Sequence, residues 1–356
     1  MFSIKSLTSI IDVLRWECKR KRLHFRKEDT LKKIVDDPRL IYKCCYLYYK
    51  DGFSQIEICE QLGISRATVS RLLKAGRDRN IVRIELDNPD SVMYGELERK
   101  LESVFDLKEI LIVDELDIGN KYEHLKKVNE EALSYFSRTF QDQDYIGISM
   151  GHTLYDLANI NYAVEDIDCT FVPVVGGVGM KQLSSQNYHS NEIAQSFAKK
   201  FNGSAVQFFA PAIFNDVAVM EGLMKERPVQ EVISLFSRLN AVIMGIGSFE
   251  SPSSTLVSSG YISQERYMHF KQQGAVGDAM LRFYDENGDT SKFEEFNNRV
   301  MGISDQDLIH VENRIAVAVG EEKSRAVLGA LRGRKINVLI TDISCVNKML
   351  AMMEDV

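Results

Sequence analysis

The stretch SQIEICEQLGISRATVSRLL, residues 54–73, decides the fold of the N-terminal part of the chain. Ser54 is a good helix N-cap, and Glu57 three residues later completes a capping box, so a helix is expected over 55–62. Gly63 tolerates the positive φ of a tight turn. Small or aliphatic residues stand where two crossing helices would touch: Ile58, Cys59, Ile64, Val69 and Leu72. The pattern predicts a helix-turn-helix unit.

The second helix of this unit, Arg66 to about Asp78, would enter the major groove of DNA with its N-terminus first. Short hydroxyls suit phosphates or base edges, and arginines suit guanine or phosphate. The candidate DNA-binding residues, all predicted to face outward, are Ser65, Arg66, Thr68, Ser70 and Arg71. Further phosphate contacts are expected from Lys74, Arg77 and Arg79. The alternative is an ordinary helical hairpin with a solvated basic face.

The flanking sequence extends this unit to residues 36–88. Apolar residues at helical spacing precede it, from Leu40 to Tyr48, and Ile81–Leu86 alternates like a short strand that would form a wing. Residues 36–88 are therefore predicted to be a winged helix-turn-helix domain. We assign no role to the extension 1–35, and we expect a linker helix over 89–106 and an effector domain over 107–356.

Composition points the same way. The chain has 356 residues, is 45% hydrophobic and carries a net charge of −7, yet Lys and Arg exceed Asp and Glu in residues 1–88. A basic N-terminal part in an otherwise acidic chain is typical of a protein whose N-terminal part binds a polyanion. No apolar run of 18 or more residues and no good secretory signal is present, so we expect a cytoplasmic protein. The six cysteines lack metal-ligand spacing, so we expect reduced thiols and no metal.

From Leu107 onward, short apolar runs alternate with helical stretches. The expected helices include 122–140, 153–159, 191–200 and 323–331. The expected strands are Glu109–Val113, Tyr145–Ser149, Thr170–Val175, Ala205–Phe209, Ala241–Ile246, Ile315–Val319 and Asn337–Thr341. This alternation predicts an α/β domain with a mostly parallel, doubly wound sheet. The loops after its strands would lie on one edge, where ligands usually bind.

Glycine-rich loops follow several of these strands: 147–153, 176–179, 245–248 and 274–278. Glycine exposes backbone N–H groups to an anion, and a following helix N-terminus adds its dipole. Together with Lys323, these loops indicate a site for an anionic ligand, although simple turn chemistry is the alternative. No phosphate-binding G-K-[ST] motif and no dinucleotide G-x-G-x-x-G motif occurs, so no cofactor is expected.

One motif suggests a different function. Gly147-x-Ser149-x-Gly151, between a strand and a helix, matches the nucleophile elbow of α/β-hydrolases. No H-G-G-G-type segment is present to build an oxyanion hole, and a DNA-binding head is unusual for an esterase. We therefore expect no hydrolase and no catalytic residue.

Taken together, these motifs resemble the SorC family of bacterial sugar-responsive transcription regulators, from about Asp37 to the C-terminus. Besides the DNA-binding segment, the resemblance rests on IGISMGHTL (146–154), FVPVVGGVG (171–179), NAVIMGIGS (240–248), GAVGD (274–278), VGEEKSRAVLGALRG (319–333) and INVLITD (336–342). It implies a sugar-phosphate isomerase-like fold, operator DNA and a phosphorylated sugar as partners, and a homotetramer.

The resemblance also implies roles for individual residues. Gly151, His152 and Thr153 would hold a phosphate, and Lys323 would pair with it as a point charge. Asp278 would accept hydrogen bonds from sugar hydroxyls. Four further residues would complete the effector site: Gly176, Gly177, Asn191 and Gly247.

The chain departs from the family pattern at Val174-Val175, where a bisphosphate-binding member carries an arginine. This departure favours an effector with one phosphate, and the segment 180–190 is longer than usual. The sequence thus predicts a ligand-controlled transcription regulator that is not an enzyme. The alternatives are a sugar-phosphate isomerase with a DNA-binding head and a DNA-tethered scaffold without a ligand.

Overall fold

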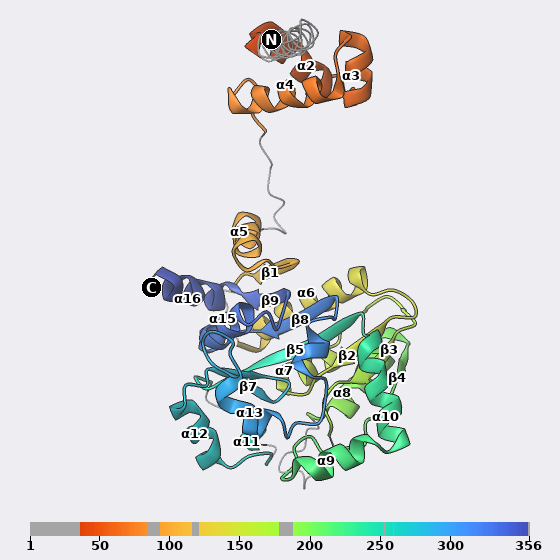
Figure 1. Ribbon diagram of the computed structural model, residues 1–356, viewed down its shortest axis with the longest axis vertical. Helices are drawn as coiled ribbons and strands as arrows, with labels where there is room; N and C mark the ends of the chain where they lie inside the picture. The colour runs from red at the N-terminus through yellow and green to blue at the C-terminus, as the bar shows by residue number, and fades with distance from the viewer. Residues whose placement is uncertain are drawn as a thin grey trace, which may run out of the picture. The chain divides into compact units, whose positions relative to one another are not determined.

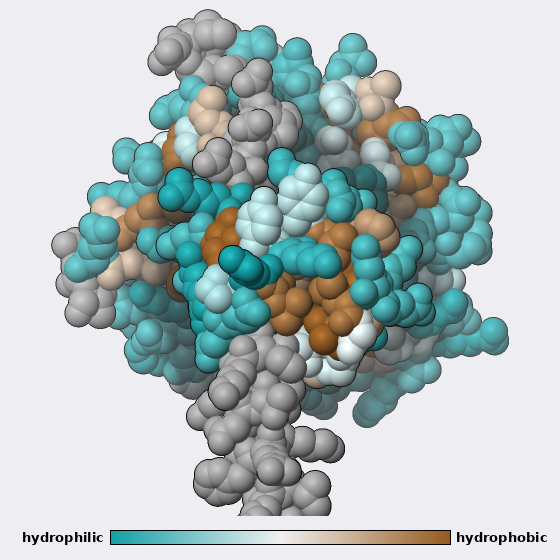
Figure 2. Space-filling model, turned by 90° about the horizontal axis from the view of Figure 1, so that it is seen from above, coloured by the Kyte–Doolittle hydropathy of each residue, from teal (hydrophilic) through white to brown (hydrophobic). Residues whose placement is uncertain are grey.

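The computed structural model describes residues 36–84, 93–115, 121–177, 188–251, 254–258 and 260–354. These residues divide into two compact units on either side of the 88–89 bond. No helix within these ranges is long and apolar enough to cross a membrane. The space-filling view shows a mostly hydrophilic surface with apolar residues gathered in patches (Figure 2).

Within residues 36–84, the smaller unit contains three helices: α2 Pro38–Tyr49, α3 Gln55–Leu62 and α4 Arg66–Asp78. The expected capping box is present, because Ser54 accepts the Glu57 N–H and the Glu57 carboxylate accepts the Ser54 N–H. Gly63 ends α3 with φ at +64°. The core of the unit is small and consists of Ile41, Cys44, Cys45, Leu47, Ile58, Val69, Leu72 and Leu73. The predicted helix-turn-helix is therefore confirmed as a local fold.

The predicted wing differs from the structure. Residues 81–84 of the expected strand Ile81–Leu86 form no strand, and Glu85 and Leu86 lie outside the described residues. The backbone N–H groups of Ile81 and Val82 both bond to the carbonyl of Gly76 in α4. The N–H groups of residues 81 and 82 are therefore bonded to the end of α4 and not to a neighbouring strand.

The larger unit is built on a parallel sheet, as predicted, with strand order β1-β9-β8-β5-β2-β3-β4. The seven strands are β1 Glu109–Val113, β2 Tyr145–Ile148, β3 Thr170–Pro173, β4 Ser204–Ala205, β5 Ala241–Ser248, β8 Asn313–Ala318 and β9 Val338–Asp342. All seven expected strands are present, although β4 is much shorter than the predicted 205–209.

Helices cover both faces of this sheet (Figure 1). On one face, apolar side chains from α6 Lys121–Thr139, α7 His152–Asn159 and α8 Ser190–Phe201 pack on the strands. On the other face, the core includes α5 Gly95–Phe105, α15 Ser324–Arg332 and α16 Ile343–Glu354. Continuous burial along β9 reflects this coverage on both sides.

The remaining helices lie mainly in the connections beyond β4, β5 and β7. They are α9 Val217–Met224, α10 Arg227–Ser234, α11 Thr255–Ser258, α12 Gln264–Gln272, α13 Glu294–Asn297 and α14 Asp305–Leu308, with 3-10 turns η1 Leu235–Arg238, η2 Ser291–Phe293 and η3 Glu321–Lys323. The helix expected over 323–331 thus begins as the turn η3 and continues as α15.

The helix expected as a linker, α5, is part of the larger unit. Its Glu98 and Glu102 carboxylates accept the N–H groups of Ile112 and Ile110 in the edge strand β1, at 2.9 and 3.1 Å. Unpaired amides on an edge strand invite pairing with another chain. The two carboxylates satisfy them instead, so α5 closes this edge of the sheet (Figure 1).

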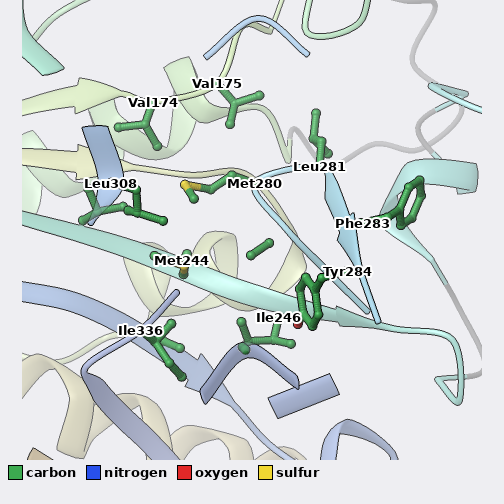
Figure 3. Close-up of a cluster of buried hydrophobic side chains, with 14 of the residues drawn as sticks. Val174, Val175, Met244, Ile246, Met280, Leu281, Phe283, Tyr284, Leu308 and Ile336 are labelled. Carbon is green, nitrogen blue, oxygen red and sulfur yellow. The ribbon is translucent and has the colours of Figure 1, made fainter. Parts of the chain in front are cut away.

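One element was not expected from the sequence. The antiparallel hairpin of β6 Gly277–Ala279 and β7 Arg282–Tyr284 pairs with the end of β5. Its turn consists of Met280 and Leu281, with φ at +51° and +66°. Glycine or asparagine normally marks such a turn. Here two buried apolar residues occupy it, within the cluster that also holds Val174 and Met244 (Figure 3).

Candidate nucleic-acid interface and ligand cavity

The candidate nucleic-acid interface is the exposed face of α4. Arg66, Ser70 and Lys74 follow one another at four-residue spacing and are exposed, and Arg71 is exposed beside them. Ser65 is also exposed, and its hydroxyl caps the helix by accepting the Thr68 N–H at 3.2 Å. The side chains free to meet a partner on this face therefore include two arginines and a lysine.

The prediction that Thr68 faces outward is wrong. Its side chain is only 4% exposed, and its hydroxyl lies 2.9 Å from the Ser65 hydroxyl. Thr68 lies four residues before Leu72, which is fully buried, so the two share the inward face of the helix. Thr68 fixes the helix start and does not belong to the exposed face.

Arg77 and Arg79 are engaged with their own unit. The Arg77 guanidinium donates to the Tyr49 hydroxyl at 2.8 Å, and Arg79 pairs with Asp36 at 2.5 Å. These bonds connect the end of α4 to Tyr49 in α2 and to Asp36, which lies just before α2. Surface bonds of this kind are weak and exchangeable, so these arginines remain secondary candidates for phosphate contacts.

The larger unit contains a cavity of about 350 Å³ beyond the carboxyl ends of the neighbouring strands β8, β5 and β2. From β2 the chain adds β3 and β4 on one side, and β5 is followed by β8 and β9 on the other. The strand order thus reverses between β2 and β5, which is where open α/β sheets bind ligands. The volume suits a small molecule.

The cavity brings together six of the nine predicted effector residues: Gly151, His152, Thr153, Gly247, Asp278 and Lys323. They come from three segments that are far apart in the sequence, namely the start of α7, the β5–β6 pair and the turn η3.

The N-terminus of α7 opens onto this cavity. Gly151 is its N-cap, with φ at +125°, and offers no side chain to the first N–H groups of the helix. The Gly151 N–H itself donates to the Tyr188 carbonyl at 3.1 Å, and the His152 ring lies 3.6 Å from the Tyr188 ring, centre to centre. An uncapped helix start of this kind favours an anion.

Asp278 faces Gly247 across the β5–β6 pairing. A Cβ placed on Gly247 would stand 1.9 Å from Asp278 Oδ1, so only glycine leaves room for the carboxylate. Burial raises the pKa of Asp278 to about 6, and nearby Lys323 partly offsets that rise. The Asp278 carboxylate is thus ionised at neutral pH but titrates within reach of it.

Lys323 is the last residue of η3 and lines the cavity. Its Nζ donates to the Ile246 carbonyl at the end of β5, at 2.8 Å. Partial burial lowers the pKa of the His152 imidazole, Asp156 opposes this shift, and the Lys323 ammonium adds to it. The same ammonium lowers the pKa of Asp278.

Three predicted effector residues are not among those that line the cavity. Asn191 is buried and bonds the Phe208 backbone through both ends of its amide, at 3.2 and 2.8 Å. Gly176 approaches the carbonyls of Ala210 and Pro211 closely, and Gly177 lies against His189. The contacts of Asn191 and Gly176 are structural, whereas a Cβ on Gly177 would meet nothing nearer than 3.4 Å. The assignment of these three residues to the effector site stays a prediction.

Sequence reasoning missed several lining residues. They include Asn129, Asp156, Ser254, Thr255, Met280, Leu281 and Glu322. Asp156 could have been found, because it lies four residues after His152 on the same face of α7. Met280 and Leu281 gave no signal, since apolar residues in a loop usually indicate core.

No group of three or more potential metal ligands occurs among the residues that the structure describes. Five cysteines fall within those ranges, and none of them forms a disulfide. Burial raises the pKa of Cys44 to about 11 and of Cys169 to about 12, so both thiols stay protonated at neutral pH.

Known proteins resemble the chain over most of its length. The family model described as "Putative sugar-binding domain" matches residues 93–351. The sorbitol operon regulator of Klebsiella pneumoniae is 32% identical over 86% of this chain and 96% of its own length. The deoxyribonucleoside regulator of Bacillus subtilis is 31% identical over 85% and 95%.

The solved structures agree. The crystal structure of the full-length sorbitol operon regulator SorC from Klebsiella pneumoniae superposes with a TM-score of 0.64 at 30% identity, covering 89% of this chain and 99% of that one. A DeoR family transcriptional regulator from Listeria monocytogenes gives 0.64 at 27% identity, covering 72% and 98%. With a helix-turn-helix unit, a parallel sheet and a cavity at its switch point, this chain belongs to the SorC family of transcriptional regulators and carries that family's sugar-binding domain.

Proposed function

We propose that the chain is a transcription regulator that binds operator DNA through α4 and is controlled by a phosphorylated sugar in the cavity beyond β8, β5 and β2. The observation that carries this proposal is the meeting of an uncapped helix start, a lysine and a carboxylate in one cavity of about 350 Å³. These groups suit the two ends of a sugar phosphate.

The phosphate is assigned to the start of α7. There the N–H groups of His152 and Thr153 have no intrahelical acceptor, and the helix dipole favours negative charge. Lys323 supplies the counter-charge. Replacing Lys323 with Ala should therefore weaken effector binding and leave DNA binding unchanged.

The sugar is assigned to the other groups of the cavity. Asp278 accepts hydrogen bonds from hydroxyls when it is ionised, and Asp156, Ser254 and Thr255 offer further polar groups. Val174 and Val175 are fully buried and apolar, so they offer no counter-charge for a second phosphate. We therefore propose an effector with one phosphate.

DNA is assigned to the exposed face of α4, with Arg66 and Arg71 as the principal contacts and Ser65 and Ser70 beside them. We propose that the protein acts in the cytoplasm as a homotetramer, without catalytic turnover. The effector would then bias the arrangement of the DNA-binding units and change the affinity for the operator.

Thermal unfolding with four phosphosugars tests the effector. Sorbitol 6-phosphate and 2-deoxyribose 5-phosphate are phosphate esters chosen for the sorbitol and the deoxyribonucleoside in the names of the two relatives, and glucose 6-phosphate and fructose 6-phosphate complete the set. A ligand at a hundred times its Kd adds roughly 2.7 kcal/mol of stability. The unphosphorylated sugars are matched controls and should give no shift. Equal shifts from both forms would contradict the assignment of a phosphate.

A mobility-shift assay on the DNA upstream of the coding region tests whether the protein binds an operator and whether the effector controls that binding. The protein should retard this DNA at moderate salt, and an effector found in the first assay should change the affinity. Retardation that is equal for unrelated DNA of the same length would refute operator recognition.

A further inference from the structure

Asp342, the last residue of β9, is a buried carboxylate with a full set of partners. It is 2% exposed. Its Oδ1 accepts the N–H of Gly320 at 3.0 Å and of Cys345 at 3.3 Å. Its Oδ2 lies 2.8 Å from the Ser344 hydroxyl and 2.9 Å from His124 Nε2. A carboxylate has about four acceptor sites, so this one has no capacity left for a ligand.

Two of the partners of Asp342, Gly320 and His124, lie next to residues that line the cavity. Gly320 opens the loop that carries Glu322 and Lys323, and His124 lies on α6, next to the lining residue Leu125. Asp342 itself is not among the lining residues. Asp342 therefore links the loop that begins at Gly320 to helix α6 without lining the cavity itself.

The link to Lys323 is short and direct. The Gly320 N–H donates to Asp342, and the Gly320 carbonyl accepts the Lys323 N–H at 3.0 Å. Gly320 has φ at +100°, so the loop turns sharply at this residue. The position of the Lys323 backbone thus depends on the bond between Gly320 and Asp342.

We propose that Asp342 is a positioning residue for the effector site, acting through Gly320 on Lys323 and through His124 on α6. This inference rests on the proposed function, because it assigns Asp342 to the support of that same cavity. Residues that orient the groups in contact with a ligand typically contribute tenfold or more to affinity, as outer-shell residues do at metal sites.

The test is a double-mutant cycle on the full chain, with the four phosphosugars named above as probes and titration calorimetry as the measurement. Asp342→Asn replaces one acceptor oxygen with an amide NH2 group, which cannot accept the hydrogen bonds that the carboxylate oxygen accepted. The loss of these bonds should lower affinity for the bound probe about tenfold. Lys323→Ala should also weaken binding. If Asp342 acts partly through Lys323, the double variant should lose less affinity than the sum of the two single losses, expressed as free energies.

Asp285→Asn is the matched control. Asp285 is also a buried carboxylate, 7% exposed, and it accepts the N–H groups of Asn287 and Asp289 and pairs with Lys292. It does not line the effector cavity. A loss of stability alone would affect both variants, whereas affinity should change only in Asp342→Asn.

The outcomes separate the two proposals. If the wild-type protein binds a probe and Asp342→Asn binds it equally well, or if the losses in the double variant are additive, the positioning role is refuted and the proposed function stands. If the wild-type protein binds none of the probes, both fail. Should Asp342→Asn not fold, His124→Phe replaces it in the cycle, and an unchanged affinity there overturns the inference.

Discussion

Replacing Gly247 with Ala should disable the effector site while leaving the sheet intact. Gly247 pairs with Asp278 across the two strands, and the carboxylate occupies the space where a side chain would stand. The added Cβ would lie 1.9 Å from Asp278 Oδ1 and 2.7 Å from its Cγ. Non-bonded heavy atoms prefer about 3.5 Å or more, so the carboxylate must move by more than about 1 Å.

That displacement has two consequences. Overpacking of a buried site typically costs about 1–3 kcal/mol of folding stability. A misplacement of about 1 Å at the site can cost on the order of a hundredfold in function. We therefore expect effector affinity to fall at least about tenfold, which corresponds to about 1.4 kcal/mol of binding free energy.

The assay is titration calorimetry with the phosphosugar that stabilises the wild-type protein, together with denaturant unfolding. Gly222→Ala is the matched control, because a Cβ at Gly222 in α9 meets nothing within 4 Å. That change should stabilise the helix by up to about 1 kcal/mol and leave affinity unchanged. If Gly247→Ala folds and binds like the wild type, the assignment of Asp278 to the effector is refuted.

Three further predictions concern the DNA face, the capping box and pH. Arg66→Ala and Arg71→Ala should each weaken operator binding and lower the salt dependence measured in mobility shifts, and an unchanged slope for both would exclude phosphate contacts. Ser54→Ala should cost about 1 kcal/mol of stability in the smaller unit, seen as faster amide exchange there; unchanged exchange would contradict the role of the cap. Because Asp278 has a pKa raised from 3.8 to about 6, it binds its proton more tightly when folded, so its contribution to stability falls as pH rises from about 4 to 6. Effector affinity should change in the opposite direction and decline below about pH 6 as the acceptor is protonated. Asp278→Asn should remove the dependence of stability and weaken that of affinity, leaving the part due to the effector phosphate, whose second pKa is also about 6. If both dependences are unchanged in this variant, another group is responsible.

Local pattern was sufficient for the helix-turn-helix and for most of the sheet. The capping box at Ser54, the turn at Gly63 and the end of α3 depend on residues within a few positions of one another. Strand β1 was predicted to the residue, because a short apolar run between polar residues is enough to define it. Thr68 was misplaced because its hydroxyl suggested a contact with DNA, although its helical phase puts it inward.

Contacts between distant segments were harder to predict. Asp156 shares a face of α7 with His152 and was available from periodicity alone. The hairpin of β6 and β7 was not, because Met280 and Leu281 occupy its turn in place of the usual glycine or asparagine. Asn191 looked like a site residue, but its amide is used by the backbone of Phe208.

By itself, the sequence determined the two kinds of unit and the parallel sheet, because helix and strand periods, caps and glycine loops depend on near neighbours. Six residues of the cavity followed from the family resemblance. Only the tertiary structure decided that Asp278 fits over Gly247 and that Asp342 holds Gly320 and His124 together. Those pairs are separated by 22 or more residues. Their contact depends on strand order and register, which no local pattern specifies.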